Sequence, residues 1–167
     1  MRQPYDPLFK PDNLNYLHGN SFRILFQRSP NIAFHLQTVN LPGLSISTAD
    51  SSTPGLQWDI AGNQLIFEEI NIEFMVDEDL SNWLEIYNWL HAIADPKSGQ
   101  SGGSIFDQVT EMQLFVYSNS NNLNKIFRFN DLYPTSLSSI SFSTQSQAEV
   151  LTATVSCNYT TYEVEGV

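Results

Sequence analysis

The residues of this chain that could do chemistry are its histidines, its cysteine and its acids. His18, His35 and His91 do not have the spacing of metal ligands, and no serine stands in a nucleophile-elbow pattern. Cys157 is the sole cysteine of the sequence, so it forms neither an intrachain disulfide nor a cysteine-based zinc site, and we expect a buried structural thiol. The sequence therefore predicts a protein without enzymatic activity, cofactor or metal.

Two acidic groups resemble functional arrangements but have simpler interpretations. The run from Asp77 to Asp79 could attract a hard cation, yet it stands where a helix is expected to begin. A short acidic side chain suits the free amides there, so we expect Asp77 or Asp79 to cap the helix. Glu68 and Glu69 are neighbours in an extended segment and point to opposite faces, which argues against an acid/base pair.

The charge balance is acidic, and its distribution is uneven. The net charge is −11, from 18 acids and 7 bases, and no Lys or Arg occurs between Ser29 and Pro96. Such a surface repels nucleic acid, because affinity for phosphates comes mainly from Lys and Arg. Charged residues make up 15% of the chain, against roughly 25% in ordinary domains. Two interpretations stay open: a solvated acidic surface, or an anionic wall inside an assembly.

Alternating apolar and polar residues predict most of the chain to be β-strand. The clearest strand is the last, where Leu151, Ala153, Val155, Cys157 and Tyr159 face one way. Its other face is polar but uncharged, and it carries Thr152, Thr154, Ser156 and Asn158. The same alternation predicts strands at 22–26, 32–36, 56–60, 70–76, 112–116, 126–129 and 140–142.

Turn residues divide these strands. Ser29-Pro30 predicts a hairpin between the first two, and Ala61-Gly62-Asn63 predicts a second turn. After Leu41-Pro42-Gly43, residues Leu44–Pro54 are rich in Ser and Thr, and we expect a long loop there.

One helix is expected at about residues 79–94. Its apolar stripe has the 3.6-residue repeat, and it ends before Asp95-Pro96. The stripe consists of Leu80, Trp83, Leu84, Tyr87 and Leu90, widened by Ile86 and Trp89. A flexible Gly/Ser connector, Ser98–Ser104, follows the helix. Prolines at 4, 7 and 11 predict an extended N-terminal arm over residues 1–20, before a single domain over 21–167. No apolar run is long enough to span a membrane as a helix.

Three segments, in order, resemble the tail tube proteins of contractile-tailed bacteriophages (myoviruses). They are the Leu41-Pro42-Gly43 turn, the stretch from Ile60 through Glu78 to Trp89, and Asp131–Leu137, which is similar to that family's aromatic-Pro-Thr turn. The resemblance implies a mainly β fold, an antiparallel β-sandwich or partial barrel with one flanking helix. It also implies hexameric rings that stack into a tail tube and conduct DNA during ejection.

The partners that the resemblance implies are further copies of the chain, the tail sheath, the tape measure and the baseplate. DNA would pass without specific binding, no membrane would be involved, and the protein would be assembled in the host cytoplasm and reside in the virion tail. Glu69 and Glu73 are candidates for an acidic lumen, beside the polar face of the last strand. Candidate contacts between rings or subunits are Leu41, Pro42, Gly43, Leu44, Ser45, Ile46, Ser51 and Pro54.

Three alternatives stay open at this point. The long arm leaves room for a baseplate tube-initiator paralogue, and the tube of a type VI-like contractile injection system would share the architecture. An alternative of another class is a monomeric β-sandwich that binds a ligand or carbohydrate through exposed aromatic residues.

Overall fold

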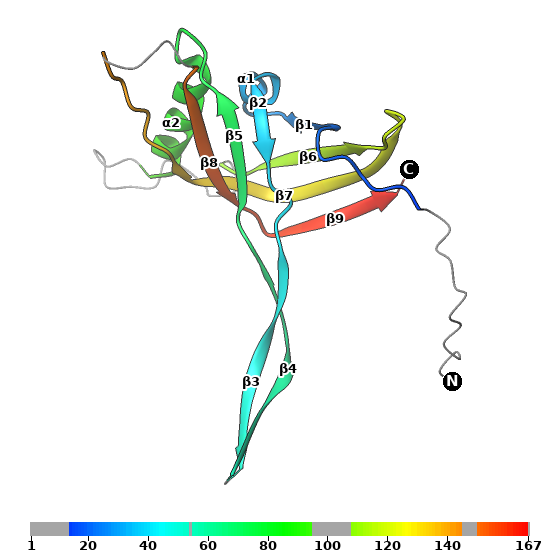
Figure 1. Ribbon diagram of the computed structural model, residues 1–167. Coiled ribbons are helices and arrows are strands. Elements are labelled where there is room, and N and C mark those ends of the chain that lie inside the picture. Colours follow the sequence, from blue (N-terminus) through cyan, green and yellow to red (C-terminus); the bar gives the residue numbers. More distant parts are fainter. Residues whose placement is uncertain (1–13, 54, 95–107, 145–149, 167) are drawn as a thin grey trace.

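The computed structural model describes residues 14–53, 55–94, 108–144 and 150–166 (Figure 1). These residues are mainly β-strand with two helices, α1 (Pro30–Phe34) and α2 (Ser81–Ile93). The strands are β1 (Phe22–Phe26), β2 (Leu36–Val39), β3 (Leu44–Thr53), β4 (Leu56–Phe67), β5 (Ile70–Met75), β6 (Thr110–Tyr117), β7 (Leu123–Leu137), β8 (Thr152–Asn158) and β9 (Thr161–Gly166). The predicted connector Ser98–Ser104 lies outside the described residues.

Seven strands form one antiparallel sheet in the order β1-β6-β7-β8-β5-β2, with β9 also paired to β7. The long strand β7 belongs to both halves of this sheet, because it pairs with β6 up to Leu132, with β9 up to Asn130, and with β8 from Tyr133 onward. Asp131 itself has a φ of 54°, a left-handed conformation that bends a strand. The sheet does not close, since β1 and β2 are its two ends. The predicted antiparallel partial barrel with a flanking helix is confirmed.

The core lies inside the bent sheet, and the alternation of the sequence places it correctly in the central strands. Ile70, Ile72 and Phe74 of β5 are fully buried, and so are Val155 and Cys157 of β8. These two strands pair along their length, so their apolar faces form one continuous surface. The prediction that Cys157 is a buried structural thiol is confirmed.

Helix α2 begins differently from the prediction. Its N-cap is Leu80, with a φ of 56°, and no side chain caps the helix, so the expected capping by Asp77 or Asp79 is wrong. The buried Asn82 anchors the first turn instead: its Nδ2 donates to the Met75 carbonyl at 2.8 Å. This bond ties the helix directly to the end of β5.

The buried face of α2 also differs from the predicted stripe. Asn82, Ile86 and Trp89 face the core, while Leu84 and Tyr87 are 43% and 41% exposed. The helix carries apolar residues on nearly all sides, so the 3.6-residue repeat does not identify which face is buried. The packing of α2 against the core determines that face. The Trp89 ring lies 5.8 Å from that of Phe26, and its Nε1 donates to a main-chain carbonyl at 2.7 Å.

The predicted hairpin over residues 22–37 is wrong. Ser29-Pro30 starts the short helix α1, because proline suits the first position of a helix, where its missing N–H is not needed. Ile32 is then buried while Phe34 is 85% exposed. The flanking strands separate, and β1 pairs with β6 whereas β2 pairs with β5.

Two predictions near the C-terminus are also wrong. Asp131–Leu137 is not a turn but the bend and second half of β7. This part of β7 pairs with β8 on one side alone, and its register shifts after Pro134; proline is tolerated at such edges and bulges. Ile140 and Phe142 form no strand, and Phe142 is 74% exposed.

At the N-terminus, the Asn119 side chain forms hydrogen bonds with the main chain of Tyr16 and of His18, so this segment lies against the turn between β6 and β7. The division into an arm and a domain stays a prediction.

The burial of Cys157 predicts an inert thiol. Burial, with a smaller contribution from the charge of Glu69, raises the pKa of this thiol to about 12, so almost no thiolate exists near neutral pH. We expect no reaction of the native protein with a thiol-specific chromogenic reagent at pH 8, and stoichiometric reaction after unfolding in guanidinium. Rapid labelling of the native protein would contradict this burial.

Glu85 predicts a pH-dependent stability. Burial raises the pKa of its carboxyl, the hydrogen bond that Asn31 donates at 2.6 Å opposes this, and the charge of Asp77 adds to it. A raised pKa in the folded state favours folding at low pH, and this contribution is lost as the pH rises through that raised pKa. We expect Glu85→Gln, which keeps the acceptor for Asn31, to raise the melting temperature at pH 7.

The gain from Glu85→Gln should shrink as the pH is lowered, because the wild-type carboxyl then takes up a proton and its raised pKa no longer opposes folding. Glu78→Gln, at an exposed position before the same helix, is the matched control and should change little. Thermal unfolding followed by circular dichroism measures both variants; a lower melting temperature for Glu85→Gln at pH 7 would refute the argument.

Candidate assembly surface

The most prominent feature of the molecule is a long two-stranded hairpin that projects from the body (Figure 1). It consists of β3 and β4, which pair with each other and with no other described strand. The prediction of a loop over Leu44–Pro54 is therefore wrong: Leu44–Thr53 is strand β3, and Pro54 lies outside the described residues. Serine and threonine do not prevent a strand when a full-length partner supplies the backbone hydrogen bonds.

The predicted turn at Ala61-Gly62-Asn63 is also strand, because β4 runs on from Leu56 to Phe67. The glycine marks a close approach of the two backbones. A Cβ at Gly62 would lie 2.6 Å from the Ser47 carbonyl oxygen, at the point where the register shifts between Ile46 and Thr48. Gly62 is thus required by the irregular pairing in mid-hairpin, and it ends no strand.

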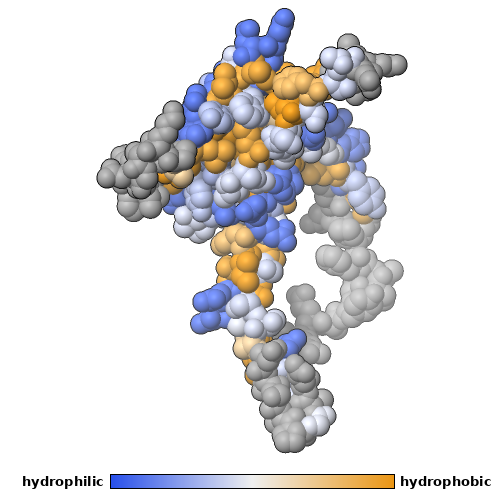
Figure 2. Space-filling view, turned by 90° about the vertical axis from the view of Figure 1, so that its left-hand side faces the viewer, coloured by the Kyte–Doolittle hydropathy of each residue, from blue (hydrophilic) through white to orange (hydrophobic). Residues whose placement is uncertain are grey.

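The hairpin carries large apolar side chains on both faces. Leu44 and Ile46 lie opposite Phe67 and Leu65 on one face, whereas Ile66 lies opposite Ser45 and points the other way. Figure 2 shows apolar surface along the part of the hairpin nearest the body. Six of these side chains are between 42% and 56% exposed: Leu44, Ile46, Trp58, Ile60, Leu65 and Ile66. An isolated two-stranded ribbon is marginally stable in water, so this one needs a cover.

The root of the hairpin is held to the body by specific contacts. The Gly43 N–H donates to Glu68 Oε2 at 3.1 Å, and the Glu68 N–H donates to the Gly43 carbonyl at 3.2 Å. Pro42 is buried beside this pair, while Leu41 is 50% exposed. Of the predicted contact residues, Leu44, Ser45 and Ile46 therefore form the first part of the hairpin, and Leu41, Pro42 and Gly43 precede it. Ser51 lies farther along β3, where the structure describes the backbone alone.

The half-sheet β2-β5-β8-β7 has two free edges among the described residues. One is β2, which pairs with β5 on one side alone. The other is the part of β7 after Leu132, which pairs with β8 but not with β6. Unpaired edges present rows of free N–H and C=O groups, which are templates for pairing with another chain.

The outer face of this half-sheet is polar, and the structure brings most of the predicted lumen residues together on it. Glu73 lies opposite Thr154, and Asn71 lies opposite Ser156, whose hydroxyl donates to the Asn71 Oδ1 at 2.7 Å. Thr152 and Asn158 mark the two ends of β8 on the same face. Glu69 is exposed but lies between β4 and β5, outside both strands.

Among the described residues, no Lys or Arg lies on β2, β5 or β8, and the cations lie in the other half of the body. Arg23 belongs to β1, and Lys125 and Arg128 belong to β7 before its bend. Arg128 pairs with Glu165 at 3.1 Å on the surface, an exposed contact of small energetic value. Among the described residues no three His, Cys, Asp or Glu gather as a metal site, and no described helix is long and apolar enough to cross a membrane.

A projecting apolar ribbon, two free edges among the described strands and a polar sheet face are surfaces through which copies of a β-protein can associate. The profile of the phage tail tube protein family matches residues 5–165, so the chain belongs to that family. It is therefore a protein of the phage tail tube class. The resemblance read from the three sequence segments is confirmed.

Solved structures share the fold. A chain of the anti-feeding prophage cap, described as tube-terminating, has a TM-score of 0.66 at 13% identity, covering 95% of this chain and 97% of that chain. A chain of the anti-feeding prophage baseplate has a TM-score of 0.60 at 14% identity, covering 87% and 91%. A chain of the sheath-tube complex of an extracellular contractile injection system has a TM-score of 0.59 at 13% identity, covering 91% and 93%. No curated protein sequence matches.

The strand predicted at 56–60 is the first part of β4, but the sequence analysis did not assign this strand to the contact surface. Trp58, Ile60, Leu65 and Ile66 were not among the predicted contact residues. A signal was present: Trp58 and Ile60 alternate with polar residues, and Leu65, Ile66 and Phe67 form an apolar run. Such a run is typical of a strand covered on both faces.

Proposed function

We propose that this protein is the subunit of a phage tail tube: copies close into a hexameric ring, the rings stack, and the tube conducts DNA during ejection. The observation that carries the proposal is the projecting hairpin with apolar side chains on both faces. A monomer leaves about half of each of these side chains in water, whereas neighbouring copies would cover them.

The free edges support ring closure. Edge β2 of one copy would pair with the second half of β7 of the next, so each copy contributes the strands β2, β5, β8 and β7. The two edges are different surfaces, and a contact between different surfaces closes into a ring when the rotation permits. A barrel of so many strands encloses an open channel rather than a packed core.

The polar face supports a lumen. Glu73, Thr154 and Ser156 lie on the face away from the core, and no Lys or Arg occurs on β2, β5 or β8. A wall without cations would let DNA slide, because each phosphate contact with a Lys or Arg would hold it. Glu69, just before β5, would extend the acidic surface.

The expected partners are further copies of this chain, the tail sheath, the tape measure and the baseplate, with the virion tail as location and assembly in the host cytoplasm. The similarity to chains from sheath-tube, baseplate and cap assemblies supports this environment. The same similarity favours a second candidate, the tube or baseplate end of a contractile injection system. The two differ in cargo, which is DNA in the first and protein in the second.

The hairpin generates the first test of assembly. Ile46→Asp combined with Leu65→Asp places two charges on paired positions of one hairpin face. Burying one such side chain completely contributes about 1.5–3 kcal/mol. Because about 1.4 kcal/mol corresponds to a tenfold change in affinity, losing the burial of two side chains should weaken association strongly. We expect a folded monomer where the wild-type protein forms rings or tubes, measured by light scattering after size exclusion and by negative-stain microscopy.

Leu25→Asp is the matched control for this variant. Leu25 is 47% exposed on β1, an apolar position of similar exposure away from the hairpin. The control should assemble like the wild-type protein. A wild-type chain that stays monomeric at high concentration would refute the proposed function and favour the monomeric ligand-binding alternative.

The polar face generates a test of the conduit. Glu73→Lys puts a cation in the centre of the proposed lumen wall, and we expect normal tubes with slower or blocked DNA release. The measurement is the rate of DNA ejection from virions that carry the variant. Glu111→Lys on β6, exposed but off this face, is the control. An unchanged rate of DNA ejection from the Glu73→Lys virions would show that Glu73 does not line the lumen.

A further inference from the structure

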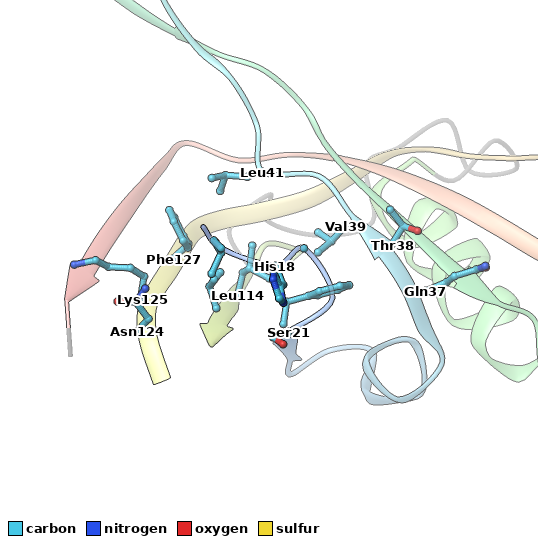
Figure 3. A pocket seen from close by; sticks show the side chains of 14 residues that line it. His18, Ser21, Gln37, Thr38, Val39, Leu41, Leu114, Asn124, Lys125 and Phe127 are labelled. Carbon is cyan, nitrogen blue, oxygen red and sulfur yellow. The ribbon is translucent and has the colours of Figure 1, made fainter. Parts of the chain in front are cut away.

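An apolar groove opens at the mouth of the unclosed sheet, beside the root of the hairpin (Figure 3). It has a volume of about 380 Å³ and is lined from β2, β6, β7 and the segment before β1. Val39, Leu114 and Phe127 converge on it from three strands, and Leu41 lies on its rim. The groove is thus an unsealed part of the core surface.

The groove has the chemistry of a side-chain acceptor. Its lining is mainly aliphatic and aromatic, and Leu114 at its base is 3% exposed. Its volume falls at the lower end of the roughly 300–1,000 Å³ typical of binding pockets. A cavity of this size holds a few large side chains and does not admit a whole element of structure.

The hairpin of the same molecule cannot supply those side chains. It leaves the body at Gly43 and Glu68 and projects away, with its apolar positions beyond the root (Figure 1). One molecule therefore carries an apolar projection and an apolar groove that it cannot bring together. Two such surfaces on one molecule generate head-to-tail contacts between copies.

The charges of the two surfaces are complementary. Lys125 and His18 line the groove, and Lys125 is one of the few cations of the chain. The hairpin from Leu44 to Phe67 has no Lys or Arg, it carries the exposed Asp59, and Glu68 follows at its root. Complementary charge favours encounter between these surfaces and disfavours groove-to-groove or hairpin-to-hairpin pairing.

We propose that the groove receives apolar side chains from the β3–β4 hairpin of a second copy, with Ile46 and Leu65 among them. This inference rests on the proposed function and names the surface on which the hairpin docks. The contact is heterologous: each copy gives a hairpin to one neighbour and accepts a hairpin from another.

The heterologous character allows a mixing experiment. Leu41→Glu places a like charge on the groove rim against the acidic hairpin, and we expect association at least about tenfold weaker than in the wild-type protein. Leu25→Glu is the matched control and should assemble normally. The hairpin variant Ile46→Asp/Leu65→Asp keeps an intact groove, while Leu41→Glu keeps an intact hairpin. Each should be monomeric alone, and an equimolar mixture should give a 1:1 heterodimer that grows no further.

The mixture separates this inference from the proposed function. If the wild-type chain assembles and Leu41→Glu assembles equally well, or if the mixture gives no heterodimer, the groove is not the docking site although the tube remains. If the wild-type chain itself does not assemble, the proposed function fails. Circular dichroism of both variants checks that they are folded.

A disulfide cross-link identifies the occupant directly. Ile46→Cys in one molecule and Asn124→Cys at the groove in another should form a dimer under mild oxidation, while the buried Cys157 stays unreactive. Asn122→Cys, in the turn before β7, is the control position and should not cross-link. A cross-link that appears only after residues 1–13 are removed would assign the groove to the chain's own N-terminal segment and overturn the inference. Native mass spectrometry that finds a bound small apolar molecule, displaced by no hairpin, would overturn it as well.

Discussion

The constraint on which this structure depends is that a two-stranded ribbon with apolar side chains on both faces is not stable in water by itself. No other described strand pairs with the β3–β4 hairpin, and six large apolar side chains along it are about half exposed. Full burial of such a side chain contributes about 1.5–3 kcal/mol, so covering the exposed halves amounts to several kcal/mol for each hairpin. Contact with neighbouring copies would release that free energy, which is the physical basis of the proposed assembly.

The body of the molecule is built to hold this ribbon and to present further surfaces around it. The bend in β7 at Asp131 divides one sheet into two halves that share the core. Within the part of the chain that the structure describes, one half presents a polar face without cations and two free edges, and the other carries the cations of β1 and β7. Reciprocal main-chain and side-chain bonds between Gly43 and Glu68 fix the root of the hairpin at the junction.

Local pattern predicted the elements that bury one face and failed where both faces or neither face were buried. The alternation in β5 and β8 is regular, because one side meets the core and the other meets solvent, so the buried residues followed directly. In α2 nearly every side is apolar, and only the packing of Asn82, Ile86 and Trp89 selected the inner face. At Ser29-Pro30 the residues suit a turn and a helix start equally, and the partners of the flanking strands decided between them.

The sequence by itself determined a mainly β protein with one substantial helix, a buried thiol, a polar face on the last strand and the resemblance to tail tube proteins. These properties depend on residue type and on spacing within single segments. Only the tertiary structure decided that Leu44–Thr53 is a strand paired along its length with β4, that Glu73 joins Thr154 on one face, and that a groove opens beside Leu41. Such features depend on which distant segments pair and where a sheet stops, and this is set by the packing of the whole chain rather than by the period of any one segment.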